Sequence, residues 1–292
     1  MTKRAGRAWA IVDRGTRLWW QAWGRRIDDV EWLDRSVAVR GLGGEGWLDE
    51  LRGSGRVRDD IPGNGILPDL GVLDSAGFRA ADLHPLVRDF YEHTSLWDMD
   101  VRIVWSRWFA FGGWLIERFF GRRVQQLAIP VTPGRSSRSM SSSVSAVFDD
   151  KGRREASAWT RRLVATGECV YSGRYATKPS PIDQTPLVHT TFPLEDGNIQ
   201  VLLTPSVEDD GSLRLSSPAG GFGEPGAYAV VRNPRRDTWH AARLPLHEEF
   251  RVYVDASGAL RTVHDLRLWR AGVLRLSYEM RRRRSGSVAM QG

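Results

Sequence analysis

The chain has 292 residues, of which 41% are hydrophobic and 26% are charged. This composition is ordinary for a globular protein and excludes a chain that is disordered throughout. The formal net charge of +7 would suit an anionic partner. However, lysine occurs only at Lys3, Lys151 and Lys178, so nearly all the basic charge is arginine, and the chain carries no nucleic-acid recognition motif. Nucleic-acid binding is therefore not expected.

Cysteine usage and apolar runs bear on the compartment. The single cysteine, Cys169, excludes an internal disulfide and fits a reducing compartment. Residues Met1–Arg17 lack an apolar segment long enough for a secretory signal. The longest apolar run, Trp108–Ile116, has nine residues, too few to span a membrane. These features predict a cytoplasmic protein, with peripheral membrane contact left open.

The apolar residues between Trp9 and Leu33 recur at steps of three and four, which predicts an amphipathic helix. Its apolar stripe is rich in tryptophan, and arginines such as Arg14 and Arg17 lie mostly off the stripe. Such a helix can pack on its own protein or on a partner. It can also lie in the interface of an anionic membrane.

A glycine-rich stretch, Val39–Ala80, follows this segment. Its glycines lack the Gly-Lys-Ser/Thr ending of a phosphate-binding loop. We expect a connector with a short helix near Trp47–Arg52. Residues 1–82 are thus predicted to form a helical arm and connector, residues 83–284 a β-rich domain, and residues 285–292 a disordered tail.

An aromatic block opens the predicted β-rich domain. A short helix is expected over Pro85–His93, then an alternating strand over Trp97–Trp105. An aromatic-rich helix over Arg107–Phe120 and a strand over Gln125–Val131 should follow. The block includes Trp97, Trp105, Trp108 and Trp114. So many rings must cover an apolar surface, either as a helix packed on the sheet or as the lining of an apolar pocket.

The second half reads as a series of short strands. Pro133–Ser145, rich in serine, is interpreted as a boundary or mobile loop. Turn sequences such as Asp149–Gly152, Glu195–Asn198 and Asp209–Ser212 separate the strands that follow. These strands are predicted over Ser157–Thr166, Cys169–Thr177, Leu187–Leu194, Ile199–Thr204, Leu213–Ser216, Glu248–Asp255, Leu260–Arg270 and Leu274–Arg281. The predicted fold is therefore α+β and mainly β: an antiparallel curved sheet, barrel or sandwich, with the aromatic-rich helix packed on it and the N-terminal amphipathic helix.

The last three predicted strands form a meander whose register can be derived from its turns. A first turn at 255–259 pairs Phe250 with His264, and a second at 270–273 pairs His264 with Tyr278. Glu248, His264 and Tyr278 are then polar members of an apolar, inward face, with Glu248 diagonal to His264. Such a trio can perform acid–base chemistry or can simply satisfy buried polar groups by hydrogen bonding.

Short motifs in the second half carry a resemblance: Trp159–Arg162, Val170–Ser172, Leu244–Val252 and Arg275–Tyr278. Their order is similar to a bacterial domain of unknown function that is sometimes fused behind nucleotide-sugar-type reductase domains. We do not expect the residues before these motifs in the sequence to form such a reductase domain. The resemblance implies a fold and no chemistry.

Three functional hypotheses follow. The leading one is a soluble, non-enzymatic module that binds an apolar or amphipathic small molecule, lipid-like for example, or a protein partner. Its binding residues would be Trp97, Trp105, Trp108, Trp114, Phe250, His264 and Tyr278. The first alternative is an enzyme with Glu248, His264 and Tyr278 as catalytic residues, and the second is a peripheral membrane protein acting through its N-terminal helix. We expect no cofactor and no metal, since histidines such as His189, His240 and His247 lack metal-ligand spacing.

Overall fold

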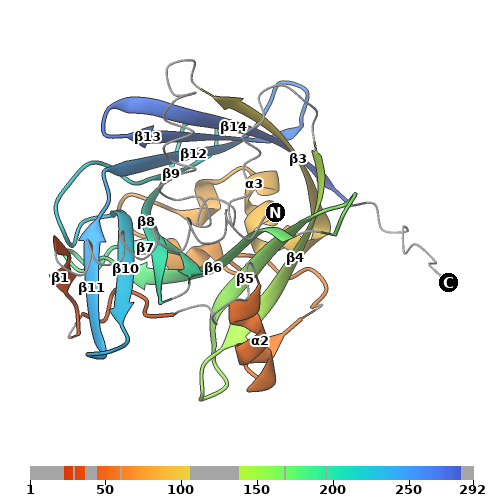
Figure 1. Ribbon diagram of the computed structural model, residues 1–292. Coiled ribbons are helices and arrows are strands. Elements are labelled where there is room, and N and C mark those ends of the chain that lie inside the picture. Colours follow the sequence, from red (N-terminus) through yellow and green to blue (C-terminus); the bar gives the residue numbers. More distant parts are fainter. Residues whose placement is uncertain are drawn as a thin grey trace.

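A closed antiparallel β-barrel of ten strands forms the centre of the molecule (Figure 1). The computed structural model describes residues 23–28, 30–36, 45–59, 61–105, 138–167, 169–194 and 196–283. Around the barrel the strands follow the order β8-β7-β6-β5-β4-β3-β14-β13-β12-β9, and pairing of β9 with β8 closes the ring. The predicted fold class is confirmed, and among its three forms the barrel is the one observed.

Most barrel strands lie where the alternation of apolar and polar residues places them. They are β3 (Trp97–Trp105), β4 (Arg138–Phe148), β5 (Arg154–Leu163), β6 (Cys169–Pro179), β7 (Pro186–Leu194), β8 (Gly197–Val207), β9 (Leu213–Ser216), β12 (Leu246–Val254), β13 (Leu260–Leu268) and β14 (Ala271–Arg282). The bounds of β3 and β9 agree with the prediction at both ends. Tight turns between neighbouring strands, such as Asp149–Gly152, explain why an antiparallel ring forms.

The interpretation of Pro133–Ser145 as a loop is wrong for residues 138–145, which belong to β4. Serine has low strand propensity, but here the small hydroxyls bond to neighbouring side chains. Ser142 Oγ accepts a hydrogen bond from Trp159 Nε1 at 2.6 Å, and Ser145 Oγ donates one to Asp59 Oδ1 at 2.5 Å. The serine-rich sequence of β4 is therefore compatible with a strand, because its hydroxyl groups have hydrogen-bond partners in the fold.

The inside of the barrel is filled in part by helix α3 (Pro85–Glu92) and the segment before it. Val87, Phe90 and Tyr91 of α3 share one buried cluster with inward residues of the strands, such as Val188 and Val252. Figure 1 shows α3 within the ring of strands. The same cluster contains residues from 66–83, a segment that includes the 3-10 turns η1 (Leu70–Leu73) and η2 (Ala80–Asp82); a third, η3 (Thr94–Leu96), leads into β3. The helix predicted over Pro85–His93 is confirmed, whereas the division into domains at residue 82 stays a prediction.

Other elements cover the outer surface of the barrel. Helix α2 (Gly46–Gly53), predicted over Trp47–Arg52, packs Trp47 and Leu48 against outward residues of β4 to β6 such as Ala158. The strand β2 (Val57–Arg58) pairs with β4. At β8 the sheet continues outside the ring through β10 (Gly226–Asn233), β11 (Thr238–Arg243) and β1 (Arg25–Arg26).

The helix predicted over Trp9–Leu33 is wrong for its C-terminal part. Arg25 and Arg26 form strand β1, which pairs with Ala241 and His240 at the edge of β11. Ile27 and Leu33 are then buried against the outer face of the barrel. An apolar spacing that suits a helix therefore serves an extended segment here, because backbone pairing at an open sheet edge competes with helix formation.

Several predicted features lie outside the described residues. They are the earlier part of the N-terminal helix, the aromatic-rich helix over Arg107–Phe120, the strand over Gln125–Val131 and the tail at 285–292. Each of these stays a prediction, and so does the membrane-surface hypothesis that depends on the N-terminal helix.

Gly65 lets the segment before α3 approach the end of that helix. A Cβ atom at Gly65 would overlap the backbone carbonyl oxygens of Tyr91 and Glu92. We expect Gly65→Ala to lower the free energy of unfolding by about 1–3 kcal/mol, because backbone atoms cannot yield as a flexible side chain can. Urea denaturation measures this change. Gly77→Ala, whose Cβ would meet nothing within 4 Å, is the matched control, and equal unfolding midpoints for the two variants would contradict the prediction.

Candidate functional site

An aromatic wall lines the inner face of β5 and β6. The alternation Ser157-Ala158-Trp159-Thr160-Arg161 turns Trp159 and Arg161 to the same side of β5. Trp159 is 5% exposed, and its ring makes edge contacts with Tyr171 and Tyr175 of β6 and with Phe90 of α3. Because α3 lies inside the ring of strands, these contacts establish that the wall faces inward.

Arg161 projects from this wall into the barrel. Its guanidinium carbon lies 3.8 Å from the ring centroid of Trp159 and 4.4 Å from that of Tyr171. It also lies 5.4 Å from the ring of Tyr278 on β14. Three steps in the ring separate β5 from β14, about 14 Å along the sheet. The two side chains therefore meet across the concave interior.

The two phenols next to Arg161 are neutral at physiological pH. Burial raises the pKa of Tyr171 well above its ordinary value. Burial likewise raises the pKa of Tyr175 to about 12, although the positive charge of Arg161 acts in the opposite direction. The hydroxyl groups of Tyr171 and Tyr175 are hydrogen-bonded to each other. The wall therefore supplies hydroxyl groups and no negative charge.

The meander brings Glu248, Phe250 and His264 together, as predicted. Phe250 pairs with His264, and the two rings stack with centroids 3.7 Å apart. His264 Nε2 lies 3.2 Å from Glu248 Oε2, and both side chains are 14% exposed. The imidazole nitrogen and the carboxylate are close but are not aligned for a hydrogen bond. The inward orientation of this face is confirmed, since Val252 and Leu260 on it are buried.

The predicted pairing of His264 with Tyr278 is wrong. His264 faces Leu276, and Tyr278 faces Thr262. Trp269 and Arg270 form the second turn, which begins one residue earlier than predicted. A β-bulge follows near the start of β14. The resulting shift of two residues keeps every side chain on its predicted face, because side chains alternate with a period of two. Tyr278 therefore remains inward, near Arg161.

The predicted tryptophan sites have different outcomes. Trp97 is buried next to Phe90, and its Nε1 donates a hydrogen bond to Asp89 Oδ2 at 3.1 Å. It therefore has a packing role at the end of α3. The backbone of Trp105 pairs with Leu274, but the Trp105 side chain lies outside the described residues, as do Trp108 and Trp114. Their binding role stays a prediction.

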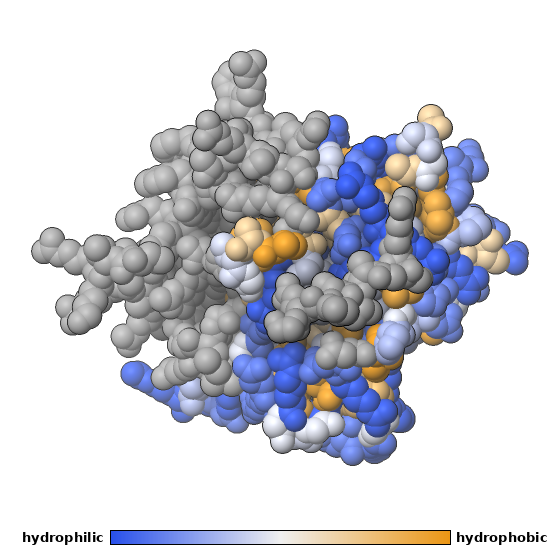
Figure 2. Space-filling model, turned by 90° about the vertical axis from the view of Figure 1, so that its right-hand side faces the viewer, coloured by the Kyte–Doolittle hydropathy of each residue, from blue (hydrophilic) through white to orange (hydrophobic). Residues whose placement is uncertain are grey.

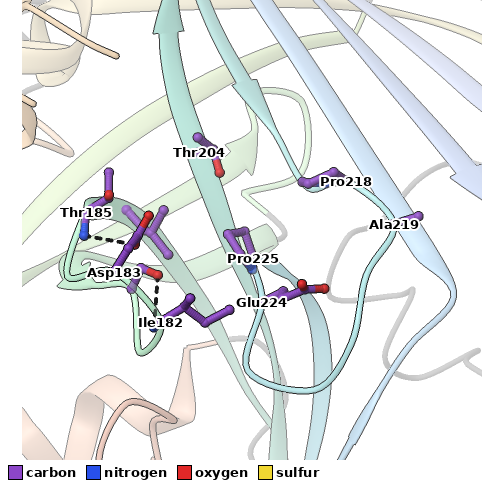
Figure 3. Close-up of a pocket in the computed structure, with 10 residues that line it drawn as sticks. Ile182, Asp183, Thr185, Thr204, Pro218, Ala219, Glu224 and Pro225 are labelled. Carbon is purple, nitrogen blue, oxygen red and sulfur yellow. Dashed lines mark hydrogen bonds between the residues drawn. The ribbon is translucent and has the colours of Figure 1, made fainter. Parts of the chain in front are cut away.

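The outer surface carries a small pocket between the β6–β7 turn and the loop before β10 (Figure 3). Its volume is about 260 Å³, and Ile182, Asp183 and Pro225 are among its lining residues. The polar groups of the turn bond to one another, as where Thr185 N donates to Asp183 Oδ1 at 3.1 Å. This volume is below the range of roughly 300–1,000 Å³ that is usual for ligand sites.

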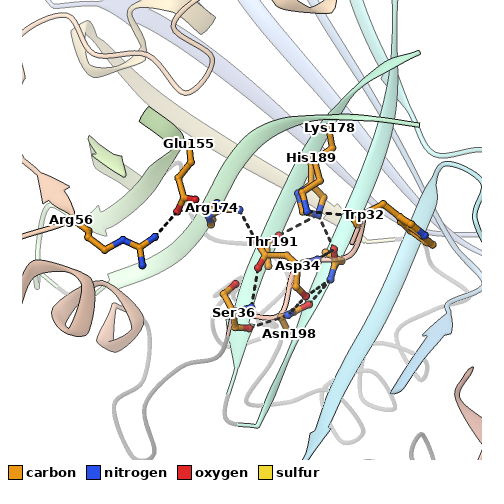
Figure 4. Close-up of polar contacts among 11 residues, drawn as sticks. Trp32, Asp34, Ser36, Arg56, Glu155, Arg174, Lys178, His189, Thr191 and Asn198 are labelled. Carbon is orange, nitrogen blue, oxygen red and sulfur yellow. Dashed lines mark hydrogen bonds and ion pairs between the residues drawn. The ribbon is translucent and has the colours of Figure 1, made fainter. Parts of the chain in front are cut away.

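A polar network on the outer face of β6 to β8 fastens the segment at residues 30–36 (Figure 4). Arg174 Nη1 lies 2.6 Å from Asp34 Oδ2. The side-chain amide of Gln200 accepts from the backbone N–H of Asp34 at 2.9 Å and donates to its carbonyl at 3.0 Å. Gln200 Oε1 also lies 2.7 Å from Nε2 of the fully buried His189.

Charge and burial set the pKa values in this network. Burial alone would raise the pKa of Asp34, but the positive charges of Arg174 and Lys178 and a hydrogen bond from the backbone N–H of Ser36 hold it at about 2. Burial lowers the pKa of His189 to about 4, and the charge of Lys178 acts in the same direction. Asp34 is therefore ionised and His189 neutral at physiological pH. These groups attach the segment to the barrel and do not face its interior.

Metal ligands do not gather in the part of the chain that the structure describes: no group of three or more histidine, cysteine or carboxylate side chains there could hold an ion. Cys169 is half-buried, and burial raises the pKa of its thiol to about 11. This pKa keeps the thiol protonated, which does not suit a nucleophile.

Comparison with known proteins finds that the chain is similar to the uncharacterized membrane protein YndJ of Bacillus subtilis (strain 168). The two are 26% identical over 258 residues, which cover 87% of this chain and 44% of YndJ. The chain thus spans less than half the length of that protein. The expected likeness to an uncharacterised bacterial protein is confirmed and extends beyond the second half, but membership of the particular domain family stays a prediction.

No family model matches the chain, and no solved structure does. Within the described ranges, none of the helices combines the length and the apolar character that crossing a membrane requires.

Proposed function

We propose that the barrel is a non-enzymatic module that binds one amphipathic small molecule in its interior. The observation that carries this proposal is the mixed chemistry of the inner wall. Aromatic rings from β5, β6, β12 and β14 surround a few polar groups, including the Arg161 guanidinium and the Glu248–His264 pair. Ligand sites in proteins typically combine an apolar lining with a small number of such groups.

The strand number supports an internal site. Barrel diameter grows with strand number, and eight strands already suffice to hold one small ligand. Ten strands enclose more space, of which α3 and residues 66–83 fill a part. We place the ligand next to Phe250, His264 and Tyr278, which belong to β12, β13 and β14 and face inward. These three residues are each only partly buried.

The outer surface supports the same placement. Among the coloured residues on the face shown in Figure 2, hydrophilic residues predominate and apolar residues lie in groups between them. The large apolar side chains that are exposed in the described ranges come from separate parts of the chain: Trp23, Val72, Val164, Ile182 and Trp269. Single exposed apolar residues are normal for a protein surface. A lipid-like ligand would also suit a relative of YndJ, whose name places that protein in a membrane.

Ligand binding can be tested with protein from which bound lipid has been extracted. We expect oleyl alcohol to displace a neutral aminoanthracene dye from the purified chain in a saturable, one-to-one manner. Phe250→Ala should weaken this binding about tenfold, because a ring in the wall is lost. Tyr253→Ala is the matched control, since Tyr253 lies on the opposite face of β12. Absence of saturable binding, or equal loss in both variants, would overturn the proposal.

A second candidate, acid–base catalysis, is favoured by the 3.2 Å approach of Glu248 to His264. It requires that a bound molecule be chemically changed. Mass spectrometry of the recovered ligand separates the two functions. A product formed by the wild-type chain but not by Glu248→Gln would favour the enzyme, whereas an unchanged ligand supports the binding module.

A further inference from the structure

Arg161 is a buried cation without a counter-charge among the described residues. The residue is 8% exposed, and its Nε has no hydrogen-bond partner. No ion pair or hydrogen bond of this side chain was found in the ranges that the structure describes; its contacts there are with three aromatic rings. The carboxylate of Glu248, on the inner face of β12, lies against His264.

Arg174 on β6 is similarly buried, but unlike Arg161 it has carboxylate partners. The side chain of Arg174 is 13% exposed and is paired with Asp34 at 2.6 Å and with Glu155 at 3.3 Å. Removing a charge from water is costly unless a partner compensates it. The faces of Trp159 and Tyr171 attract the cation and offset only part of that cost. The neighbouring phenols are neutral, as their raised pKa values show, so they add no negative charge.

We propose that Arg161 anchors the anionic headgroup of the ligand, a carboxylate or a phosphate. This inference rests on the proposed function and adds the chemical class of the ligand. A guanidinium presents paired N–H donors that match the oxygens of either anion, and such charge-assisted bonds are strong in a water-poor site. Tyr171 and Tyr175 belong to the same wall. One of their hydroxyls donates to the other, and the remaining O–H can donate to a further oxygen of the headgroup. The hydrocarbon part then lies along the apolar side chains of β12 to β14.

The test compares oleate, oleyl phosphate and oleyl alcohol, which share one hydrocarbon tail. Each displaces the aminoanthracene dye from the full chain, below its micelle concentration. We expect at least one anion to bind about tenfold more tightly than the alcohol, since hydrogen bonds to a charged group are lost with the alcohol. The preferred anion identifies the headgroup.

The variants Arg161→Met and Arg161→Lys separate charge from geometry. Arg161→Met should remove the preference for the anion while alcohol binding persists, and Arg161→Lys should retain part of the preference. Arg162→Met is the matched control, because Arg162 is the next residue on β5, faces outward and is 45% exposed. It should bind all three molecules as the wild type does. Circular dichroism verifies that each variant is folded.

Two results would overturn the inference and leave the proposed function intact. The first is a wild-type chain that binds all three molecules equally. The second is an anion preference that survives in Arg161→Met. If none of the three molecules binds the wild-type chain, both the inference and the proposed function fail.

Discussion

Trp159→Ala is expected to lower the free energy of unfolding by about 3–5 kcal/mol, the usual cost of truncating a buried aromatic residue. Trp159 connects α3, β6 and Arg161 inside the barrel. Its loss removes the ring that Phe90 and Tyr175 pack against and the largest part of the support for the Arg161 guanidinium. It also leaves the hydroxyl of Ser142 without its indole donor. Urea denaturation followed by circular dichroism measures the change.

Two further variants separate these contributions. Trp159→Phe keeps a ring but loses the hydrogen bond to Ser142, so it should cost about 1–3 kcal/mol. Trp23→Ala removes an indole that is 78% exposed and should change the free energy of unfolding by less than about 0.5 kcal/mol. If Trp159→Ala costs no more than Trp23→Ala, then Trp159 is not the centre of the interior packing.

Acidification from about pH 6.5 to about pH 4 is expected to cost up to about 3 kcal/mol of stability through His189. The pKa of His189 is lowered in the fold from 6.5 to about 4. The unfolded chain therefore binds a proton that the folded chain does not, and stability falls as the pH falls through this window. Above about pH 6.5 the full contribution is present. Asp34, whose pKa is about 2, adds its own loss only below about pH 3.8.

The variant His189→Gln tests this assignment, because glutamine does not titrate. Its unfolding free energy should vary less between pH 6.5 and pH 4 than that of the wild type. Hydrogen exchange at the Asp34 amide, which donates to Gln200, reports whether the segment at residues 30–36 detaches first. Identical pH dependence in the two proteins would show that His189 does not carry the effect.

Much of the barrel could be predicted because its strands show a local sequence pattern, the alternation of apolar and polar residues. Alternation in β3, β12 and β13 follows directly from one face being buried and the other being wet. The first meander turn could be placed because the Asp255–Gly258 sequence determines it, and Phe250 does pair with His264. The predicted position of the second turn was wrong, but the error displaces β14 by two residues. The prediction of which β14 side chains face inward therefore still holds.

The failures occurred where neighbours outweigh local preference. The serines of β4 suggest a loop, but Ser142 bonds to a side chain of the neighbouring strand β5 and Ser145 bonds to Asp59, which follows β2. Residues 25–33 carry a helical spacing, but an open edge at β11 pairs with Arg25 and Arg26. The bulge that follows Trp269 depends on where Val273 can be buried, which alternation alone does not specify.

The candidate site could be predicted only in part, for the same reason. Glu248 and His264 lie on adjacent strands, so a derived register brings them together. Arg161 and Tyr278 meet only because the sheet closes on itself, and neither residue carries a local motif for that contact. The only sequence feature that pointed to the site was that Trp159 and Arg161 lie two residues apart on one strand and therefore share a face. It gains meaning only when that face is known to be enclosed.

The most direct test of internal binding is a crystal structure of the chain with a fatty acid that carries bromine on its tail. Our account predicts an anomalous bromine peak within the ring of strands, on the side lined by Phe250 and Tyr278, with the carboxylate at Arg161. A bromine peak confined to the outer surface, with side chains filling the interior around Arg161, would contradict it.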